Sequence, residues 1–209
     1  MQKIFCMANF ITLLRLLLLF LVIALVQYAS PTWQLLTAPL SIVVMLLDVA
    51  DGMIARARQE TSLFGAVFDI ATDRIIEISL WVVLLKSNFV SIWIPIIFVV
   101  RGVLVDALRK KYSDLGLEPF SIMRTVLGRF CVSSRSMRFL YGMFKLISFA
   151  WLLFLLPASV LWSNVYSANL PLISMVSYIL IYSTLAICLI RGIPVILETI
   201  LLQQFKLPK

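Results

Sequence analysis

The sequence predicts an all-α polytopic membrane protein with six transmembrane helices. Hydrophobic residues make up 62% of its 209 residues and charged residues only 13%, and the mean hydropathy is +1.05, far above that of a soluble protein. Several runs approach the roughly 20 apolar residues that cross a bilayer as a helix. Because these runs are continuously apolar rather than alternating, they argue against a transmembrane barrel. We therefore expect one membrane domain over residues 1–209.

The apolar runs place the six spans in order along the chain. They lie at 10–29, 33–55, 69–87, 90–109, 138–162 and 170–190. Arg15 interrupts the first run, so we interpret that run as a span rather than as a cleavable signal peptide. The polar stretch at 110–135 separates spans four and five, and its later part, 120–131, predicts a short interfacial helix or a solvated basic loop. The sequence RGIP at 191–194 predicts the end of the sixth span, with 195–205 lying along the interface.

The positions of the basic residues predict how the chain is oriented. Lys3 precedes the first span, Arg56 and Arg58 follow the second, and a dense basic group lies between the fourth and fifth. The links at 30–32 and 163–169 carry no charge. By the positive-inside rule, both termini and the link between spans two and three are expected on the cytoplasmic side.

Composition also narrows the chemistry. The chain has no histidine, which excludes Ser-His-Asp catalysis and histidine-ligated zinc and leaves a carboxylate as the natural base. Its three cysteines, Cys6, Cys131 and Cys188, are far apart and form no disulfide or metal motif. Since the basic residues lie between spans, the net charge of +8 is better explained by orientation and by anionic lipids or substrates than by nucleic acid.

Eight spaced residues around the link between spans two and three carry most of the chemical information, and we call them the aspartate motif. They are Asp48, Asp51, Gly52, Ala55, Arg56, Gly65, Asp69 and Asp73. Asp48 and Asp51 are three positions apart, and Asp69 and Asp73 are four apart. On helices, the two members of each pair project from the same face. Four carboxylates are unfavourable inside a membrane unless they are neutralised. Divalent cations suit such ligands, so the motif predicts a site for Mg²⁺ or Mn²⁺, with two ions for four carboxylates.

The residues between the aspartates suggest what else binds there. Gly52 and Ala55 leave a bare strip of backbone that a ligand can approach, and Gly65 does the same on the other arm. Arg56 presents a fork suited to phosphate, and Ser62 offers a hydroxyl. The alternatives are structural: a single intramembrane aspartate can cap a helix or line an ion pathway, and small residues can permit close helix packing.

The aspartate motif resembles the signature of the CDP-alcohol phosphatidyltransferase family, D-x2-D-G-x2-A-R-x8-G-x3-D-x3-D, at every fixed place. The opening Asn9-x2-Thr12-x2-Arg15 is similar to that of the phosphatidylglycerophosphate synthase branch. The resemblance implies that an alcohol hydroxyl attacks the β-phosphate of CDP-diacylglycerol and that CMP leaves. It implies a multi-pass protein of the bacterial inner membrane, with its active site cytoplasmic, membrane lipids around it and a homodimeric assembly.

The resemblance also implies a role for each matched position. Asp48, Asp51 and Asp69 match metal ligands. Asp73 matches the general base and is also a candidate ligand. The remaining matched or neighbouring positions are expected to bind the CDP-lipid: Gly52, Ala55, Arg56, Ser62 and Gly65.

The acceptor alcohol is less well specified. Basic residues on or near spans four and five favour an anionic acceptor, glycerol 3-phosphate first and inositol phosphate or inositol next: Arg101, Arg109, Arg135, Arg138 and Lys145. Arg101 and Lys145 fall inside apolar runs, where a charge either faces a cavity or snorkels to the interface. Gly102 replaces the glutamate usual in the synthase branch, and the usual Gly-Lys-x-Lys-Thr stretch is absent, so serine or another polar alcohol stays open.

Two other classes of function remain as alternatives. A cation transporter or channel predicts polar residues along several spans, whereas the acids here crowd one side of the membrane. A catalytically silent scaffold of the same fold predicts loss of ligands, whereas all four aspartates are present. Both observations favour the enzyme.

Overall fold

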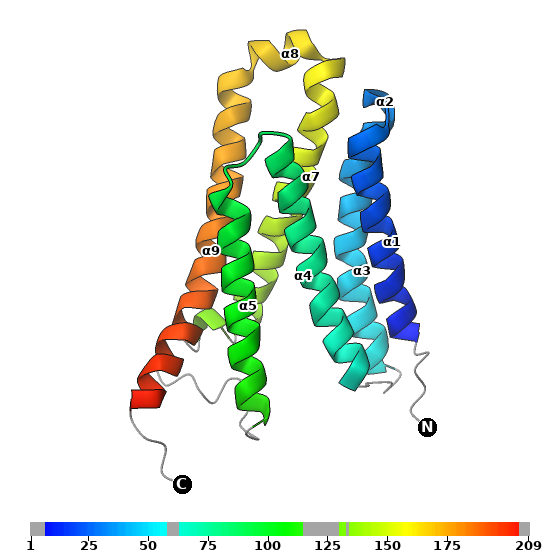
Figure 1. The fold of residues 1–209 in the computed structure, drawn as a ribbon. Coiled ribbons are helices and arrows are strands. Elements are labelled where there is room, and N and C mark those ends of the chain that lie inside the picture. Colours follow the sequence, from blue (N-terminus) through cyan, green and yellow to red (C-terminus); the bar gives the residue numbers. More distant parts are fainter. Residues whose placement is uncertain (1–6, 58–62, 115–129, 133, 205–209) are drawn as a thin grey trace. The chain divides into compact units, whose positions relative to one another are not determined.

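The computed structural model describes residues 7–57, 63–114, 130–132 and 134–204, and these form helices joined by short turns (Figure 1). The helices are α1 (Met7–Tyr28), α2 (Pro31–Gln34), α3 (Thr37–Ala57), α4 (Leu63–Lys86), α5 (Trp93–Asp114), α7 (Arg135–Leu161), α8 (Ser163–Ala168) and α9 (Leu170–Gln204). This part of the chain contains no β-strand. The predicted all-α class is confirmed, and the chain is a polytopic membrane protein.

Four segments of these helices are long and apolar enough to cross a membrane. They are Asn9–Tyr28, Pro31–Ala50, Ser136–Leu161 and Leu170–Ile200. The predicted third and fourth spans correspond to α4 and α5. The 24 residues of α4 extend over about 36 Å at 1.5 Å per residue, but α4 carries Asp69, Asp73 and other charges. The total of six spans therefore stays a prediction.

The chain divides into two compact units. Unit 1 comprises Met1–Ser91 and Leu146–Ser177, and unit 2 comprises Ile92–Lys145 and Tyr178–Lys209. Helices α7 and α9 therefore each contribute one part to unit 1 and another to unit 2.

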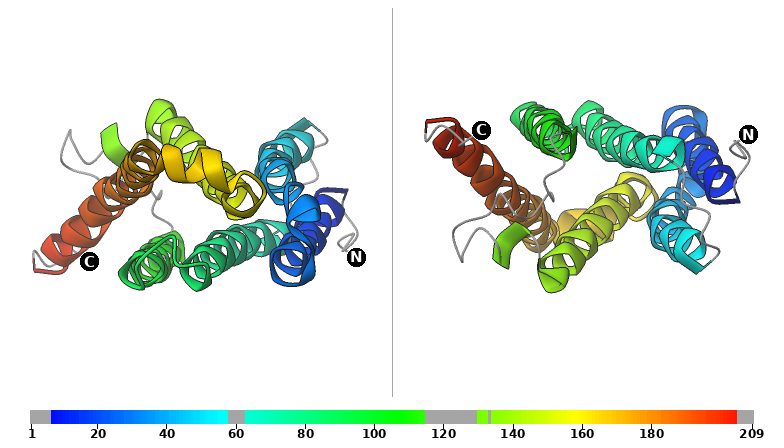
Figure 2. Two further views of the ribbon diagram at one scale, coloured as in Figure 1. Left: turned by 90° about the horizontal axis from the view of Figure 1, so that it is seen from above. Right: turned by 90° about the horizontal axis from the view of Figure 1, so that it is seen from below.

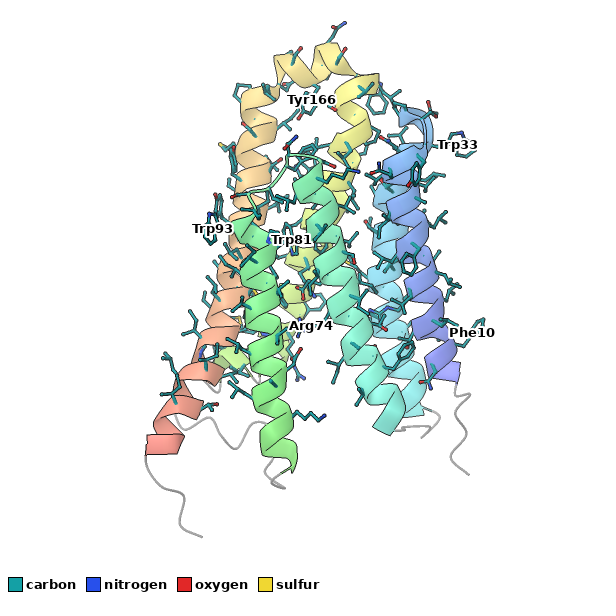
Figure 3. All side chains as sticks on the ribbon, viewed as in Figure 1. Phe10, Trp33, Arg74, Trp81, Trp93 and Tyr166 are labelled. Atoms are coloured by element: carbon teal, nitrogen blue, oxygen red, sulfur yellow. The ribbon has the colours of Figure 1, made fainter. Side chains whose placement is uncertain are left out.

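In unit 1, helix α1 packs against both α3 and α4 (Figures 1 and 2). Leu19 and Val22 of α1 and Val44 of α3 are almost completely buried. Trp81 of α4 is fully buried and packs on Phe149, with ring centroids 4.8 Å apart. Other apolar side chains point outward, as Phe10 and Trp33 do in Figure 3. Helices that bury some apolar side chains against one another and expose others on the outside suit a lipid environment.

Unit 2 is built from α5, the first part of α7 and the second part of α9. Val105 of α5, Val132 and Val195 of α9 form a buried cluster, with Ile196 packed against it. The Thr184 hydroxyl of α9 donates to the Phe144 carbonyl of α7 at 3.3 Å. These contacts bring together segments far apart in the sequence.

The second predicted span, 33–55, corresponds to α3 preceded by the short helix α2, and the chain turns between these two helices. The Gln34 amide donates to the carbonyls of Val26 and Ala29, at 3.2 and 3.1 Å, and the Thr37 hydroxyl donates to the Gln34 carbonyl at 2.7 Å. These hydrogen bonds satisfy backbone carbonyls that would otherwise lack partners where the helix is interrupted, so they stabilise the turn. The uncharged link at 163–169 likewise contains a short helix, α8.

The prediction that the RGIP sequence ends the sixth span was wrong. Helix α9 has 35 residues and continues through Pro194 to Gln204. Proline removes one backbone donor, but membrane helices tolerate it where neighbouring groups pack against the helix. Val195, the next residue, is buried in the valine cluster of unit 2, which favours continuation. The predicted interfacial helix at 120–131 lies mostly outside the described residues.

Candidate active site

Two aspartates of the motif meet at one arginine in unit 1. The Arg15 guanidinium of α1 lies 2.6 Å from Asp48 Oδ1 through Nη2 and 3.1 Å from Asp69 Oδ1 through Nη1. Its Nε donates to the Val44 carbonyl of α3 at 3.3 Å. Asp48 lies on α3 and Asp69 on α4, so one guanidinium joins three helices.

The arginine and the aspartates differ in their exposure. The Arg15 side chain is only 2% exposed, whereas those of Asp48 and Asp69 are 40% and 45% exposed. Each contact to Arg15 uses one oxygen of a carboxylate that has about four acceptor sites. The two aspartates are therefore partly accessible although Arg15 is buried, and oxygen donors of this kind fit a hard divalent cation.

The rest of the aspartate motif follows the expected placement on α3 and α4. Gly65 and Asp73 lie on α4, and Asp73 is half-buried one helical turn after Asp69. The motif residues after Asp48 on α3 are helical in backbone: Asp51, Gly52, Ala55 and Arg56. Their side chains, and Ser62 altogether, lie outside what the structure describes. No group of three acidic, histidine or cysteine residues close enough to hold a metal occurs among the described residues, so the four-carboxylate site stays a prediction.

A second ion pair lies further along α4. Arg74 donates to Glu77 at 2.7 Å, and the Glu77 side chain is 3% exposed. Arg74 is labelled on α4 in Figure 3. This pair belongs to the same helix as Asp69 and Asp73 but includes no aspartate of the motif, which makes it a useful comparison for Arg15.

Unit 2 contains a group of buried cations around one tyrosine, which we call the cation cluster: Arg101, Lys145, Arg191 and Tyr141. Lys145 Nζ lies 4.8 Å from the centroid of the Tyr141 ring, Arg191 Cζ lies 5.2 Å from it and Arg101 Cζ lies 5.9 Å from it. All four side chains are buried. A cation near the face of an aromatic ring is stabilised by it, and grouped basic side chains of this kind can also take part in binding an anion.

Arg101 is held closely by its neighbour on α9. A Cβ atom added to Gly192 would lie 2.6 Å from Arg101 Cγ and 2.7 Å from its Nε. Glycine is required for this approach. Among the described residues, Arg101 Nε has no hydrogen-bond acceptor. A buried guanidinium with an unsatisfied donor is a natural partner for an anionic ligand.

The structure brings together only some of the predicted acceptor residues. Arg101 and Lys145 are in the cation cluster, whereas Arg138 is exposed. The side chains of Arg109 and Arg135 lie outside the description. Sequence reasoning missed Arg191 because it assigned that residue to the end of a span. The signal that identified Arg101 and Lys145, a charge within an apolar run, applies to Arg191 as well.

Comparison with known proteins identifies the family. Over 111 residues the chain is 29% identical to a CDP-diacylglycerol–glycerol-3-phosphate 3-phosphatidyltransferase of Wigglesworthia glossinidia brevipalpis, covering 51% of this chain and 59% of that protein. Over 96 residues it is 29% identical to the protein of the same name in Escherichia coli strain K12, covering 44% and 52%. The chain thus spans somewhat more than half the length of these relatives. The sequence model of the CDP-alcohol phosphatidyltransferase family matches residues 5–202, so the chain belongs to that family.

Proposed function

We propose that this protein transfers the phosphatidyl group of CDP-diacylglycerol to glycerol 3-phosphate and releases CMP, in phospholipid biosynthesis. The observation that carries the reaction class is the meeting of Asp48 and Asp69 at Arg15. These residues occupy two of the four acidic places of the family motif and come from different helices. The acceptor is suggested by the names of the relatives and by the cation cluster in unit 2.

The carboxylates of Asp48, Asp51, Asp69 and Asp73 would hold one or two Mg²⁺ or Mn²⁺ ions. When bound, such ions stabilise negative charge on the diphosphate and on the leaving group. The CDP part would be bound by the rest of the motif and its neighbour: Gly52, Ala55, Arg56, Ser62 and Gly65. The small residues allow close approach, and the Arg56 guanidinium matches the geometry of a phosphate.

Asp73 would act as the general base, because the chain has no histidine and this residue lies on the same helix as Asp69. Its carboxylate would take the proton of the acceptor hydroxyl, and the hydroxyl oxygen would form a bond to the β-phosphorus of CDP-diacylglycerol. The bond from that phosphorus to the bridging oxygen breaks, and CMP leaves with the bonding electrons. A positioned base of this kind contributes about 10²–10⁴-fold to the rate.

The cation cluster would bind the phosphate of the acceptor. Arg101, Lys145 and Arg191 are buried basic side chains from three helices, and such side chains can pair with the dianion of a phosphate monoester. The fixed forks of two arginines favour a tetrahedral phosphate over a neutral alcohol such as inositol. A zwitterionic acceptor such as serine has no phosphate to pair with these side chains.

The basic residues in the sequence support a location in a bacterial inner membrane, with the aspartate motif toward the cytoplasm. Glycerol 3-phosphate and CMP are water-soluble, so this orientation would let them enter and leave on the side where nucleotides are made. The tails of CDP-diacylglycerol would remain in the bilayer.

The first experiment is CMP release by purified protein in detergent with CDP-diacylglycerol and Mg²⁺. The acceptors are glycerol 3-phosphate, inositol 1-phosphate, inositol, serine and no addition. We expect release with glycerol 3-phosphate alone and a phosphatidylglycerophosphate product by mass spectrometry. Release only with an inositol compound would keep the reaction class and replace the acceptor. No release with any acceptor, from folded protein, would contradict the proposed reaction with these alcohols.

A further inference from the structure

Arg15 is a buried charge that the proposed reaction does not use directly. It lies in the first half of α1, between the buried residues Leu19 and Val22 on one side and the start of the helix on the other. A buried cation in a membrane protein is unfavourable without a partner. Here contacts to two carboxylates of the aspartate motif and to a backbone carbonyl satisfy it.

We propose that Arg15 is a positioning residue for the metal site, in that its guanidinium sets the distance and orientation between the carboxylates of Asp48 and Asp69. This inference rests on the metal dependence in the proposed function. The bond from Nε to the Val44 carbonyl fixes the plane of the guanidinium relative to α3. The two terminal nitrogens then each contact one aspartate oxygen, at 2.6 and 3.1 Å, so both carboxylates are held by the same rigid group.

The charges are compatible with this role. The single positive charge of Arg15 reduces the repulsion between the two aspartates but cannot neutralise both, so they still attract a cation. The 40% and 45% exposure of Asp48 and Asp69 leaves them open to a ligand while Arg15 remains behind them. This is the arrangement of outer-shell residues in metal sites, which hold a ligand in position without touching the ion.

Lysine cannot replace arginine in this geometry. An ammonium group is a single point of charge, whereas the guanidinium presents its donors in a fixed plane. Arg15→Lys therefore keeps the charge but loses the fixed spacing, and Arg15→Gln loses both. Comparing the two variants separates positioning from simple neutralisation.

The test measures Mn²⁺ binding directly, by electron paramagnetic resonance of free Mn²⁺ in solutions of the purified protein without substrates. We expect the dissociation constant for Mn²⁺ to rise about 10–100-fold in Arg15→Gln, the usual effect of losing an outer-shell partner, and to rise in Arg15→Lys as well. The matched control is Arg74→Gln, which breaks another arginine–carboxylate pair on α4. It should leave Mn²⁺ affinity unchanged, even if it lowers the melting temperature.

Three outcomes would overturn the inference. Mn²⁺ binding by Arg15→Gln that is as tight as in the wild type, or tighter, would show that Arg15 only neutralises the aspartates and competes with the metal for them. An equal loss of binding in Arg74→Gln would assign the effect to general destabilisation. Absence of Mn²⁺ binding by the wild type would overturn the proposed metal dependence itself, which distinguishes the two failures. If Arg15→Gln does not yield folded protein, Mn²⁺ binding by Arg15→Lys is compared with that of the wild type and of Arg74→Gln instead.

Discussion

Replacing Gly192 by alanine should impair use of the acceptor alcohol while sparing use of the CDP-lipid. The added Cβ would lie 2.6 Å from Arg101 Cγ and 3.2 Å from its Cδ, whereas nonbonded carbon atoms prefer about 3.5–4.0 Å. Arg101 must therefore move by about 1 Å at Cγ. Because Cγ is only one bond beyond Cβ, rotation of the distant guanidinium cannot relieve the overlap, and either χ1 of Arg101 or the spacing of α5 and α9 must change.

A displacement of this size has a large expected effect. A misplacement of about 1 Å in a positioned group can lower the rate about 10²-fold. We therefore expect kcat/KM for glycerol 3-phosphate to fall about 10–100-fold in Gly192→Ala, since a 1 Å shift weakens a bidentate phosphate contact. The KM for CDP-diacylglycerol should not change, because the CDP-lipid is proposed to bind at the aspartate motif, to which Gly192 does not belong.

The assay is CMP release with one substrate varied and the other saturating. Gly142→Ala on α7 is the matched control: it makes the same substitution in a helix of unit 2, and its Cβ would meet nothing within 4 Å. Both changes favour the helix by about 0.5–1 kcal/mol, so a difference between them reports the contact with Arg101. Wild-type acceptor kinetics in Gly192→Ala, or an equal rise in both KM values, would refute the reasoning.

Three further predictions concern the proposed chemistry. Asp73→Asn should lower kcat about 10²–10⁴-fold as expected for loss of a general base, with the melting temperature unchanged; an active variant would exclude Asp73 as the base. Chelation of divalent metal should abolish CMP release and added Mg²⁺ or Mn²⁺ should restore it, so full activity in excess chelator would contradict metal dependence. Lys145→Ala should raise the KM for glycerol 3-phosphate more than that for CDP-diacylglycerol, and parallel changes would indicate a structural role.

Local sequence patterns were sufficient to predict where helices form and which of the candidate site residues share one helix. Apolar runs located the helices, and the regular spacing of Asp69 and Asp73 placed them on one face of α4. The ends of the helices were harder to predict from the sequence. Pro194 favours termination locally, but packing of Val195 in the valine cluster extends α9 to Gln204. The break after Gln34 depends on side-chain bonds to Val26 and Ala29, which no periodicity reveals.

Contacts between distant segments could not be predicted from one sequence. Arg15 was visible as a charge within an apolar run, but nothing in its neighbourhood indicated that Asp48 and Asp69 are its partners. The grouping of Arg101, Lys145 and Arg191 around Tyr141 likewise depends on how three helices pack. In both cases the residue types indicated that a partner was needed, and the packing determined which one.

The contact of Arg15 with Asp69 has a consequence for the synthesis of the protein. The two residues are 54 positions apart, so at about 5–20 residues per second Asp69 is synthesised roughly 3–11 s after Arg15. Arg15 lacks both carboxylate partners until Asp48 has been synthesised, 33 positions after it, and it lacks Asp69 until α4 follows; an unpaired arginine at the centre of an inserting helix is disfavoured by about 2.5–3.5 kcal/mol. Arg15 therefore gains its full set of carboxylate partners only after α3 and α4 have joined α1.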